Sequence, residues 1–191
     1  MKKGVSISIT ALVILIFMLL VLPHKDREHI HKTEVVAPFK IEGRKNFFQA
    51  GPIFFGGQPD EETLRWIANQ GVNLVINLRT EKEMTKHTED EFDEPALVKE
   101  LGMVYTTIPL GGDTGYPASA VDELAELLKT QVGNTLIHCA SAGRVSHLWM
   151  AYLVKYKHYS IDEAIETGKK IKFVFPLEEL LDASFTIKAK S

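Results

Sequence analysis

The stretch Val132–Ser146 reads VGNTLIHCASAGRVS and contains the only cysteine in the sequence, Cys139. It opens with the apolar run TLIHC, which is typical of a buried strand, and Arg144 follows where a helix is expected to begin. Four small residues connect the two: Ala140, Ser141, Ala142 and Gly143. A loop between the carboxyl end of a strand and the start of a helix is where α/β sheets bind ligands. The stretch therefore predicts an α/β domain with an anion-binding loop.

The residues of this loop suit both the binding and the attack of an anion. Small side chains allow the successive backbone N–H groups of residues 140–143 to converge on one anion. The planar guanidinium of Arg144 adds two parallel donors. The same N–H groups and the helix dipole favour the thiolate form of Cys139. The loop thus predicts a nucleophile together with a receptor for the anion that it attacks, whereas a structural buried cysteine would need neither.

Polar neighbours of the loop are candidates for supporting roles. His138 lies on the buried strand, and we expect it to position the loop of Cys139 rather than to transfer protons. Ser146 has two interpretations: a hydrogen-bond donor to the thiolate from the first helical turn, or a helix residue with no part in catalysis. His147 and Trp149 lie farther along the same helix, and we assign both to packing.

Length and composition favour one globular domain. The chain has 191 residues, of which 45% are hydrophobic, and this is enough for one ordinary core. A net charge of -3 gives no basic field for nucleic acid, so no nucleic-acid partner is expected. A single cysteine excludes an intramolecular disulfide framework. No metal or other cofactor is expected, because no carboxylate or cysteine constellation follows His24, His29 and His31 at ligand spacing.

The N-terminus predicts a membrane segment. Residues Val5–Leu22 are uncharged and apolar and follow Lys2 and Lys3; at about 1.5 Å per residue such a stretch just spans a bilayer. The next residues, LPHKDREHIHK, lack the small-residue site of a cleaved signal peptide, so a single-pass anchor is preferred over a signal. Because long domains translocate regardless of nearby charge, we expect an extracytoplasmic (periplasmic) catalytic domain.

The predicted organisation is a membrane anchor or signal at 1–22, a polar tether at 23–45 and a catalytic domain at 46–191. Within the last region, helical and strand patterns alternate. Strands are predicted at 72–78, 103–108 and 135–139. Helices are predicted at 62–71, 95–101, 121–132 (opened by Ser119 and Asp122), 144–157, after Ser160 with Glu163 as its cap partner, and 176–185. The alternation predicts a compact three-layer α/β domain with a short, mainly parallel central sheet flanked by helices. The acidic cluster Glu89, Asp90, Glu91, Asp93 and Glu94 is interpreted as a solvated loop.

Three motifs carry a family resemblance. The segment IHCASAGRVS resembles the catalytic loop of cysteine-dependent protein tyrosine and dual-specificity phosphatases. The closest resemblance is to bacterial phosphatase-like domains, some of which are fused to β-lactamase-like hydrolases. Over about residues 47–170 the chain carries their three motifs: Gly57-Gln58-Pro59, Val75–Glu83 with Arg79, and His138–Val145.

The resemblance implies a dual-specificity-phosphatase-like fold and hydrolysis of a phosphate monoester through a cysteinyl-phosphate on Cys139. The substrate would be a phosphorylated protein or a small phosphate ester. The family supplies a general acid from a mobile loop, and Asp113 in YTTIPLGGDTGYP lies in the corresponding place, with glycines on both sides that suit a hinge. An aspartate in an ordinary turn is the alternative. Arg79 is expected to be structural and paired with a nearby acid.

The catalytic loop departs from the phosphatase pattern in one respect. Four residues separate Cys139 from Arg144, where phosphatases of this superfamily have five, and Val145 replaces their Ser or Thr. Four is also the spacing of rhodanese-type sulfurtransferases, so a sulfurtransferase with a persulfide on Cys139 stays an alternative, as does a catalytically weak oxyanion-binding module. Ala140, where rhodaneses carry arginine, and His138 before the cysteine favour the phosphatase.

Overall fold

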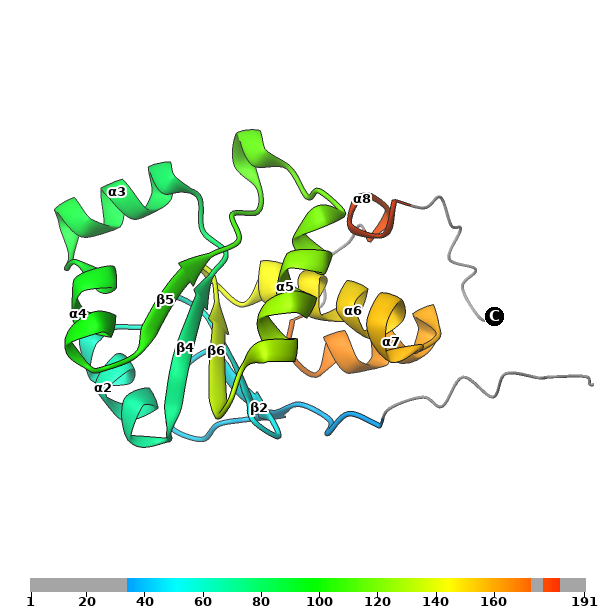
Figure 1. Ribbon diagram of the computed structural model, residues 1–191, viewed down its shortest axis with the longest axis horizontal. Coiled ribbons are helices and arrows are strands. Elements are labelled where there is room, and N and C mark those ends of the chain that lie inside the picture. Colours follow the sequence, from blue (N-terminus) through cyan, green and yellow to red (C-terminus); the bar gives the residue numbers. More distant parts are fainter. Residues whose placement is uncertain (1–33, 173–176, 183–191) are drawn as a thin grey trace, which may run out of the picture. The chain divides into compact units, whose positions relative to one another are not determined.

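The computed structural model describes residues 34–172 and 177–182 (Figure 1). The predicted membrane segment Val5–Leu22 and the three histidines of the tether lie outside these residues. Among the described residues, no helix is both long and apolar enough to cross a membrane.

The central sheet has six strands in the order β1-β2-β3-β6-β4-β5. Their bounds are β1 Phe39–Lys40, β2 Phe47–Ala50, β3 Ile53–Gly56, β4 Val72–Asn77, β5 Val104–Thr107 and β6 Asn134–His138. Strands β3, β6, β4 and β5 are parallel, and the hairpin β2–β3 adds β2 and β1 in antiparallel pairing at one edge. The prediction of a mainly parallel sheet is therefore confirmed.

Helices cover both faces of this sheet (Figure 1). On one face α2 (Glu61–Asn69) and α4 (Glu94–Glu100) pack on Phe54, Val75 and Leu136. On the other face lie α5 (Ser119–Thr130), α6 (Gly143–Lys157), α7 (Ile161–Lys169) and α8 (Glu178–Leu181). Helix α3 (Glu81–Asp90) buries no residue, and η1 (Gly112–Thr114) is a single 3-10 turn. Two separate cores on the two faces confirm the predicted three-layer architecture.

Several local predictions need correction. The strand predicted at 103–108 is the edge strand β5, and Val104 on it is 62% exposed instead of buried. Helix α5 begins at Ser119, but its N-cap is Ala118, so Ser119 does not cap it. The capping box of Ser160 and Glu163 at α7 is confirmed.

The predicted tether extends too far into the domain. Phe39–Lys40 pairs with β2, and the backbone N–H of Val35 donates to the Tyr159 hydroxyl at 3.0 Å. The Arg44 guanidinium donates to Thr63 Oγ1 at 3.0 Å and lies over the ring of Trp66. Residues 34–45 are thus part of the folded domain.

Candidate active site

Strands β3, β4 and β6 end at the same level of the sheet. In the strand register Gly56 of β3 and Asn77 of β4 both lie beside His138, the last residue of β6. The backbone N–H of Cys139 donates to Gly56 O at 3.2 Å, and the N–H of Leu78 donates to His138 O at 2.8 Å. Cys139 therefore lies directly beyond the carboxyl edge of three parallel strands, where α/β sheets bind ligands.

The Gly-Gln-Pro motif holds the loop that follows Cys139. The backbone N–H of Gln58 donates to Ala140 O at 3.1 Å. A side chain at Gly57 would place its Cβ 3.3 Å from the same oxygen, so the two loops approach closely only with glycine there. At the end of the loop Ala142 adopts a left-handed conformation, with φ of 66°, which is uncommon for alanine. Such backbone strain persists where surrounding contacts over-determine it.

The N-terminus of α6 has no side-chain cap. Its N-cap residue is Ala142, and no side chain accepts a hydrogen bond from the first turn. By contrast, four other helices are capped by side chains: those of Asp60, Thr80, Asp93 and Ser160. The first N–H groups of a helix have no intrahelical acceptor. The predicted phosphate-binding residues Ala140, Ser141, Ala142, Gly143 and Arg144 thus precede or begin an uncapped helix next to Cys139.

Arg144 is held by Glu83 from the start of α3. Its Nη1 and Nη2 donate to Glu83 Oε2 and Oε1, each at 2.7 Å, and Nη1 also donates to Leu110 O at 2.8 Å and Leu78 O at 3.3 Å. The hydrogen bond from Arg144 lowers the pKa of Glu83 to about 2. The same bond raises the pKa of Arg144, and the neighbouring Cys139 adds to that shift.

These contacts leave one edge of the Arg144 guanidinium free. Glu83 occupies the end-on edge, formed by Nη1 and Nη2, and the two backbone carbonyls take the other proton of Nη1. Within residues 34–172 and 177–182, neither Nε–H nor the second proton of Nη2 has an acceptor. These two donors form the side-on edge of the planar fork, which matches two oxygens of a phosphate.

A second arginine connects this pair to the Gly-Gln-Pro loop. The Nη1 of Arg79 donates to Gln58 Oε1 at 2.6 Å, its Nη2 donates to Glu83 O at 3.2 Å, and its Nε lies 3.6 Å from Glu83 Oε1. The prediction that Arg79 is structural and paired with a nearby acid is confirmed. Arg79 thereby joins the loops that follow β3 and β4.

The network ends on a fully buried contact between His138 and Glu94, next to Cys139 in the sequence. Nε2 of His138 lies 2.8 Å from Oε1 of Glu94, and both side chains are inaccessible to solvent. Gln58 Nε2 donates to the other oxygen of Glu94. Burial acts to raise the pKa of Glu94, but the charge of His138 and the hydrogen bonds from His138 and Gln58 outweigh it, so that pKa lies below its ordinary value. The interpretation of Glu94 as part of a solvated loop was wrong.

The predicted general acid lies on a glycine-rich loop against Arg144. Asp113 belongs to η1 and is exposed, and Gly111, Gly112 and Gly115 around it all have positive φ. Leu110 immediately before this loop accepts the 2.8 Å hydrogen bond from Arg144. The residue that precedes the loop thus contacts Arg144, while Asp113 is exposed to solvent.

The other predicted residues have buried positions in α6. The Ser146 hydroxyl donates its one proton to Gly168 O at 3.1 Å, so in this structure it is not available to the Cys139 thiolate. His147 packs edge-on against Tyr116 with 5.9 Å between ring centroids, and burial lowers its pKa to about 4. Trp149 packs on Phe55 at 4.9 Å. The assignment of His147 and Trp149 to packing is confirmed.

The sequence reasoning missed two site residues, Glu83 and Glu94. Glu83 ends the Val75–Glu83 motif, and Thr80 forms a capping box with it, a pattern that the sequence Thr-x-x-Glu would have indicated. Glu94 had a weaker signal, the Asp-Glu-Pro order that is typical of a helix start. Nothing local indicates that its carboxylate turns inward to His138.

The sequence profile of a family described as "DSP-PTPase phosphatase fused to NAD+ Kinase" matches residues 28–174. The chain belongs to this family. It is a cysteine-dependent phosphatase of the protein tyrosine and dual-specificity type. The predicted superfamily is confirmed and favoured over the sulfurtransferase; the narrower resemblance to domains fused to β-lactamase-like hydrolases stays a prediction. No curated protein sequence matches the chain.

Solved structures show the same fold at low sequence identity. Tk-PTP in its active form is 19% identical, with a TM-score of 0.56 over 76% of this chain and 97% of that one. A putative phosphatase (DUF442) from Shewanella putrefaciens CN-32 is 23% identical, with a TM-score of 0.55 over 73% and 91%. A Cys-to-Ser form of P. aeruginosa TpbA in complex with phosphotyrosine is 12% identical, with a TM-score of 0.54 over 70% and 78%.

Proposed function

We propose that the phosphatase hydrolyses phosphate monoesters with Cys139 as nucleophile, Arg144 as phosphate-binding residue and Asp113 as general acid. The observation that carries this assignment is the free side-on edge of Arg144 beside Cys139, at a helix start without a side-chain cap. Together these groups offer donors for a tetrahedral dianion at the position that a thiolate would attack.

In the first step the Cys139 thiolate attacks phosphorus. The Sγ–P bond forms while the bond between phosphorus and the ester oxygen breaks, and Asp113 donates a proton to that leaving oxygen. The phosphoryl charge spreads over three equatorial oxygens in the transition state. Two of them lie against the side-on edge of Arg144, and the N–H groups of residues 140–143 stabilise the rest.

In the second step water hydrolyses the cysteinyl-phosphate. Asp113, now ionised, accepts a proton from the attacking water. The new bond joins the water oxygen to phosphorus, the Sγ–P bond breaks, and inorganic phosphate leaves with the Cys139 thiolate restored. The protons balance over the cycle, because Asp113 gives one to the leaving oxygen in the first step and takes one from water in the second.

Glu83 and Glu94 act as positioning residues in this proposal. Glu83 binds the end-on edge of the Arg144 guanidinium and so fixes the plane of that group. The side-on edge of Arg144 is therefore oriented before substrate binds. Glu94 fixes His138, the residue before the nucleophile, from inside the domain. Preorganised donors are effective because little reorganisation is needed when charge develops.

Phosphotyrosine is the substrate class that we propose to test first. The P. aeruginosa TpbA structure, which shares the fold, contains phosphotyrosine, and this supports the choice. A polar pocket of about 500 Å³ is lined by Ala140 of the proposed phosphate-binding loop together with Gly57, Asn46 and Arg44. It offers room for the organic part of a phosphorylated residue.

The membrane location is retained as a proposal. If Val5–Leu22 is an uncleaved anchor with the catalytic domain outside the cytoplasm, the full-length chain will sediment with membranes and protease added to spheroplasts will remove the domain. Recovery of a soluble mature chain beginning after about Leu22 from intact cells would contradict the anchor.

A paired assay of the full-length protein tests the function. With p-nitrophenyl phosphate as substrate, Cys139→Ser should abolish phosphate release and still bind an oxyanion, because the backbone donors remain. Arg144→Lys should lower kcat/KM by about 10²–10³-fold, since a point charge cannot replace the side-on fork. A parallel reaction with thiosulfate and cyanide tests the alternative. Phosphate release that survives Cys139→Ser, or Cys139-dependent thiocyanate without phosphate release, would contradict the phosphatase.

A further inference from the structure

The loop of residues 41–46, between β1 and β2, lies at the catalytic end of the sheet. It leads into β2, whose first residue pairs with Gly56 of β3, and Gly56 in turn pairs with the last residue of β6. The backbone N–H of Gly57 donates to Asn46 O at 3.0 Å. A Cβ added to Gly57 would lie 3.4 Å from the Cβ of Asn46 and 3.5 Å from the Cα of Ser141. Asn46 thus lies against the proposed phosphate-binding loop.

The side-chain amide of Asn46 has no partner. It makes no hydrogen bond with the residues that the structure describes, and the half-buried side chain keeps its amide in contact with solvent. Asn46 lines the same polar pocket as Ala140 and Arg44. Its backbone is left-handed, with φ of 56°, a conformation that asparagine tolerates better than most residues. The amide is therefore available to a ligand in this pocket.

The loop that carries Asn46 is anchored on both sides. The backbone N–H of Ile41 donates to Phe47 O at 2.9 Å and closes the loop. The Arg44 guanidinium, in the middle of the loop, donates to Thr63 Oγ1 of α2 at 3.0 Å. These contacts hold Asn46 in place before any ligand binds, so its amide is preorganised in the sense that lowers the cost of binding.

One charged side chain in the pocket lining is unpaired. Arg44 pairs with Glu62 at 3.5 Å. Asp60 accepts from a backbone N–H in the first turn of α2 at 2.8 Å. Lys45 is exposed, and within residues 34–172 and 177–182 it has neither an ion pair nor a hydrogen bond. The lining therefore offers one free positive charge, on the residue that precedes Asn46.

We propose that this pocket binds the main chain of a phosphopeptide next to its phosphorylated residue, with Asn46 as the specificity-determining residue. The inference rests on the proposed phosphatase function and names its substrate class, a phosphorylated residue within an acidic polypeptide. The Asn46 amide carries both an acceptor and donors, so it pairs with the N–H of one peptide unit and the C=O of another. A polar pocket suits this occupant, because every peptide unit needs hydrogen-bond partners. Lys45 contacts an acidic side chain of the same peptide.

The first test compares two substrates of the full-length protein. A capped peptide with phosphotyrosine between glutamines should have a kcat/KM at least about tenfold above that of free phosphotyrosine, which has no peptide unit. Asn46→Gly removes the amide and keeps the left-handed backbone, so the ratio of the two values should fall by about tenfold. His158→Gly is the matched control. His158 is also left-handed, with φ of 59°, but it follows the last turn of α6, at the opposite end of that helix from the catalytic loop, and its loss should not change the ratio.

A ratio near one in wild type, or a ratio that survives Asn46→Gly, would overturn the inference. Phosphate release from p-nitrophenyl phosphate by the same preparations reports on the proposed function alone, so the two failures are distinguishable. Calorimetric titration of full-length Cys139→Ser protein with the same peptide gives a readout without catalysis. Asn46→Gly in that background should weaken peptide binding by about tenfold. Equal binding with and without Asn46→Gly would also overturn the inference.

The second test exchanges the glutamines of the peptide for glutamates. Wild type should prefer the glutamate peptide by about two- to fivefold in kcat/KM, and the preference should shrink in about 0.5 M NaCl. Lys45→Gln should abolish the preference. Lys99→Gln, at an exposed lysine of α4, is the control and should keep it. A preference that is the same in Lys45→Gln as in wild type would overturn the choice of an acidic peptide.

Discussion

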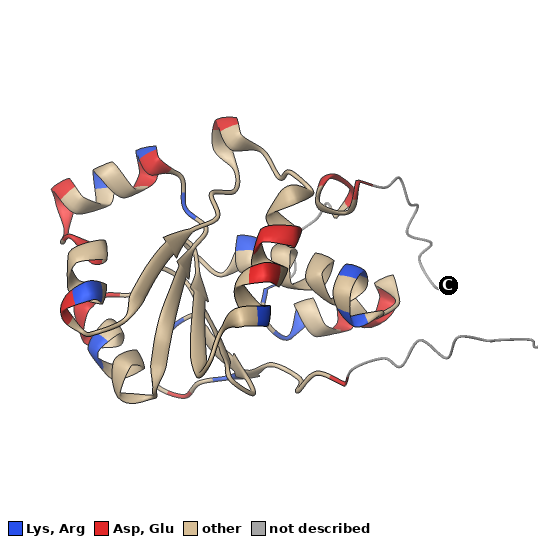
Figure 2. Cartoon of the chain, in the orientation of Figure 1, with Lys and Arg blue, Asp and Glu red and all other residues tan. Residues whose placement is uncertain are grey.

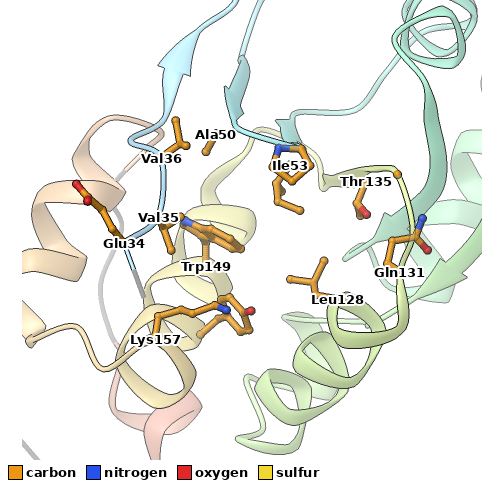
Figure 3. Close-up of a pocket in the computed structure, with 13 residues that line it drawn as sticks. Glu34, Val35, Val36, Ala50, Ile53, Leu128, Gln131, Thr135, Trp149 and Lys157 are labelled. Carbon is orange, nitrogen blue, oxygen red and sulfur yellow. The ribbon is translucent and has the colours of Figure 1, made fainter. Parts of the chain in front are cut away.

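The two ends of β6 carry different kinds of buried side chain. At the carboxyl end, His138 has Glu94 at 2.8 Å, and Arg144 has Glu83 at 2.7 Å. At the amino end, Thr135 and Trp149 are uncharged and lie beside the aliphatic side chains of Leu128 and Ile53 (Figure 3). The paired side chains at the carboxyl end of β6 come from separate loops and helices. Their pairing therefore fixes the catalytic loop relative to the elements around it. The uncharged side chains of the amino end cannot form such pairs, so the preorganised charges lie at the catalytic end.

Charge does not concentrate at either end of the domain. Figure 2 shows acidic residues on α3, α4 and α5 and basic residues interspersed among the same helices and α6 and α7. The catalytic end therefore depends on specific pairs and on the free edge of Arg144 rather than on a broad basic surface. This favours recognition of one phosphate over attraction of any polyanion.

The largest expected effect is on the chemistry of the catalytic end. Asp113→Asn should lower kcat for phosphotyrosine by roughly 10²–10⁴-fold, because the leaving oxygen then departs without a proton. A nitrophenyl ester has an acidic leaving group and should lose much less. Comparison of kcat for the two substrates checks the role. Equal losses for both would exclude Asp113 as the general acid.

The next largest expected effect is on stability, and it comes from the buried contact between His138 and Glu94. Glu94→Gln should lower the free energy of unfolding by about 1–3 kcal/mol, because it removes the carboxylate that lies 2.8 Å from buried His138 and accepts from Gln58. Urea titration measures the change. The double variant Glu94→Gln with His138→Gln is the control and should lose less stability than the two single variants added together, because either single substitution already removes their contact. A double variant that loses as much stability as Glu94→Gln and His138→Gln lose when added together would show that the two residues are not coupled.

A smaller effect follows from Glu83 and depends on pH. Its pKa is about 2 in the folded protein against an ordinary value of 4.5. Because the folded value is lower, Glu83 stabilises the fold above pH 4.5, and this contribution disappears as the pH falls towards 2. Wild type should therefore exceed Glu83→Gln in unfolding free energy at pH 7, with the difference shrinking between pH 4.5 and 2. A difference that is constant with pH would contradict the pairing with Arg144.

The smallest expected catalytic effect is at the far end of β6. Thr135→Val should leave kcat and KM for p-nitrophenyl phosphate within about twofold of wild type. Residues more than about 7–10 Å apart that share no partner usually act independently, and Thr135 lies at the opposite end of β6 from Cys139. Trp149→Phe should behave alike. Steady-state assays of both variants measure this. A large loss in kcat would mean that the two ends are coupled through β6 and α6.

Much of the fold followed from the sequence because it depends on local patterns. The apolar run before Cys139 and the small residues after it predicted β6, the loop and α6 within one or two residues. The hairpin β2–β3 was missed because both strands are only four residues long, although Gly51, with φ of 59°, and Pro52 mark its turn.

Only the parts of the candidate site whose residues lie close together in the sequence could be predicted. Cys139 and Arg144 share one loop, and Arg79 lies in a motif with its partner Glu83. Glu94 could not be selected from a run of acidic residues, because it is buried against His138, which lies on β6, far away in the sequence. Ser146 faces Gly168 instead of Cys139 because α7 packs against α6, a contact that no local pattern encodes.

The central claim is that Cys139 is a phosphoryl-accepting nucleophile. Rapid acid quench of the full-length protein turning over an aryl phosphate, followed by peptide mass spectrometry, tests it most directly. The account predicts one phosphoryl group on the peptide with Cys139, none in Cys139→Ser, and a higher trapped fraction in Asp113→Asn with a nitrophenyl ester, because water then lacks its base. Phosphate turnover without a modified Cys139, or sulfane sulfur on Cys139 after thiosulfate in place of phosphate, would contradict it.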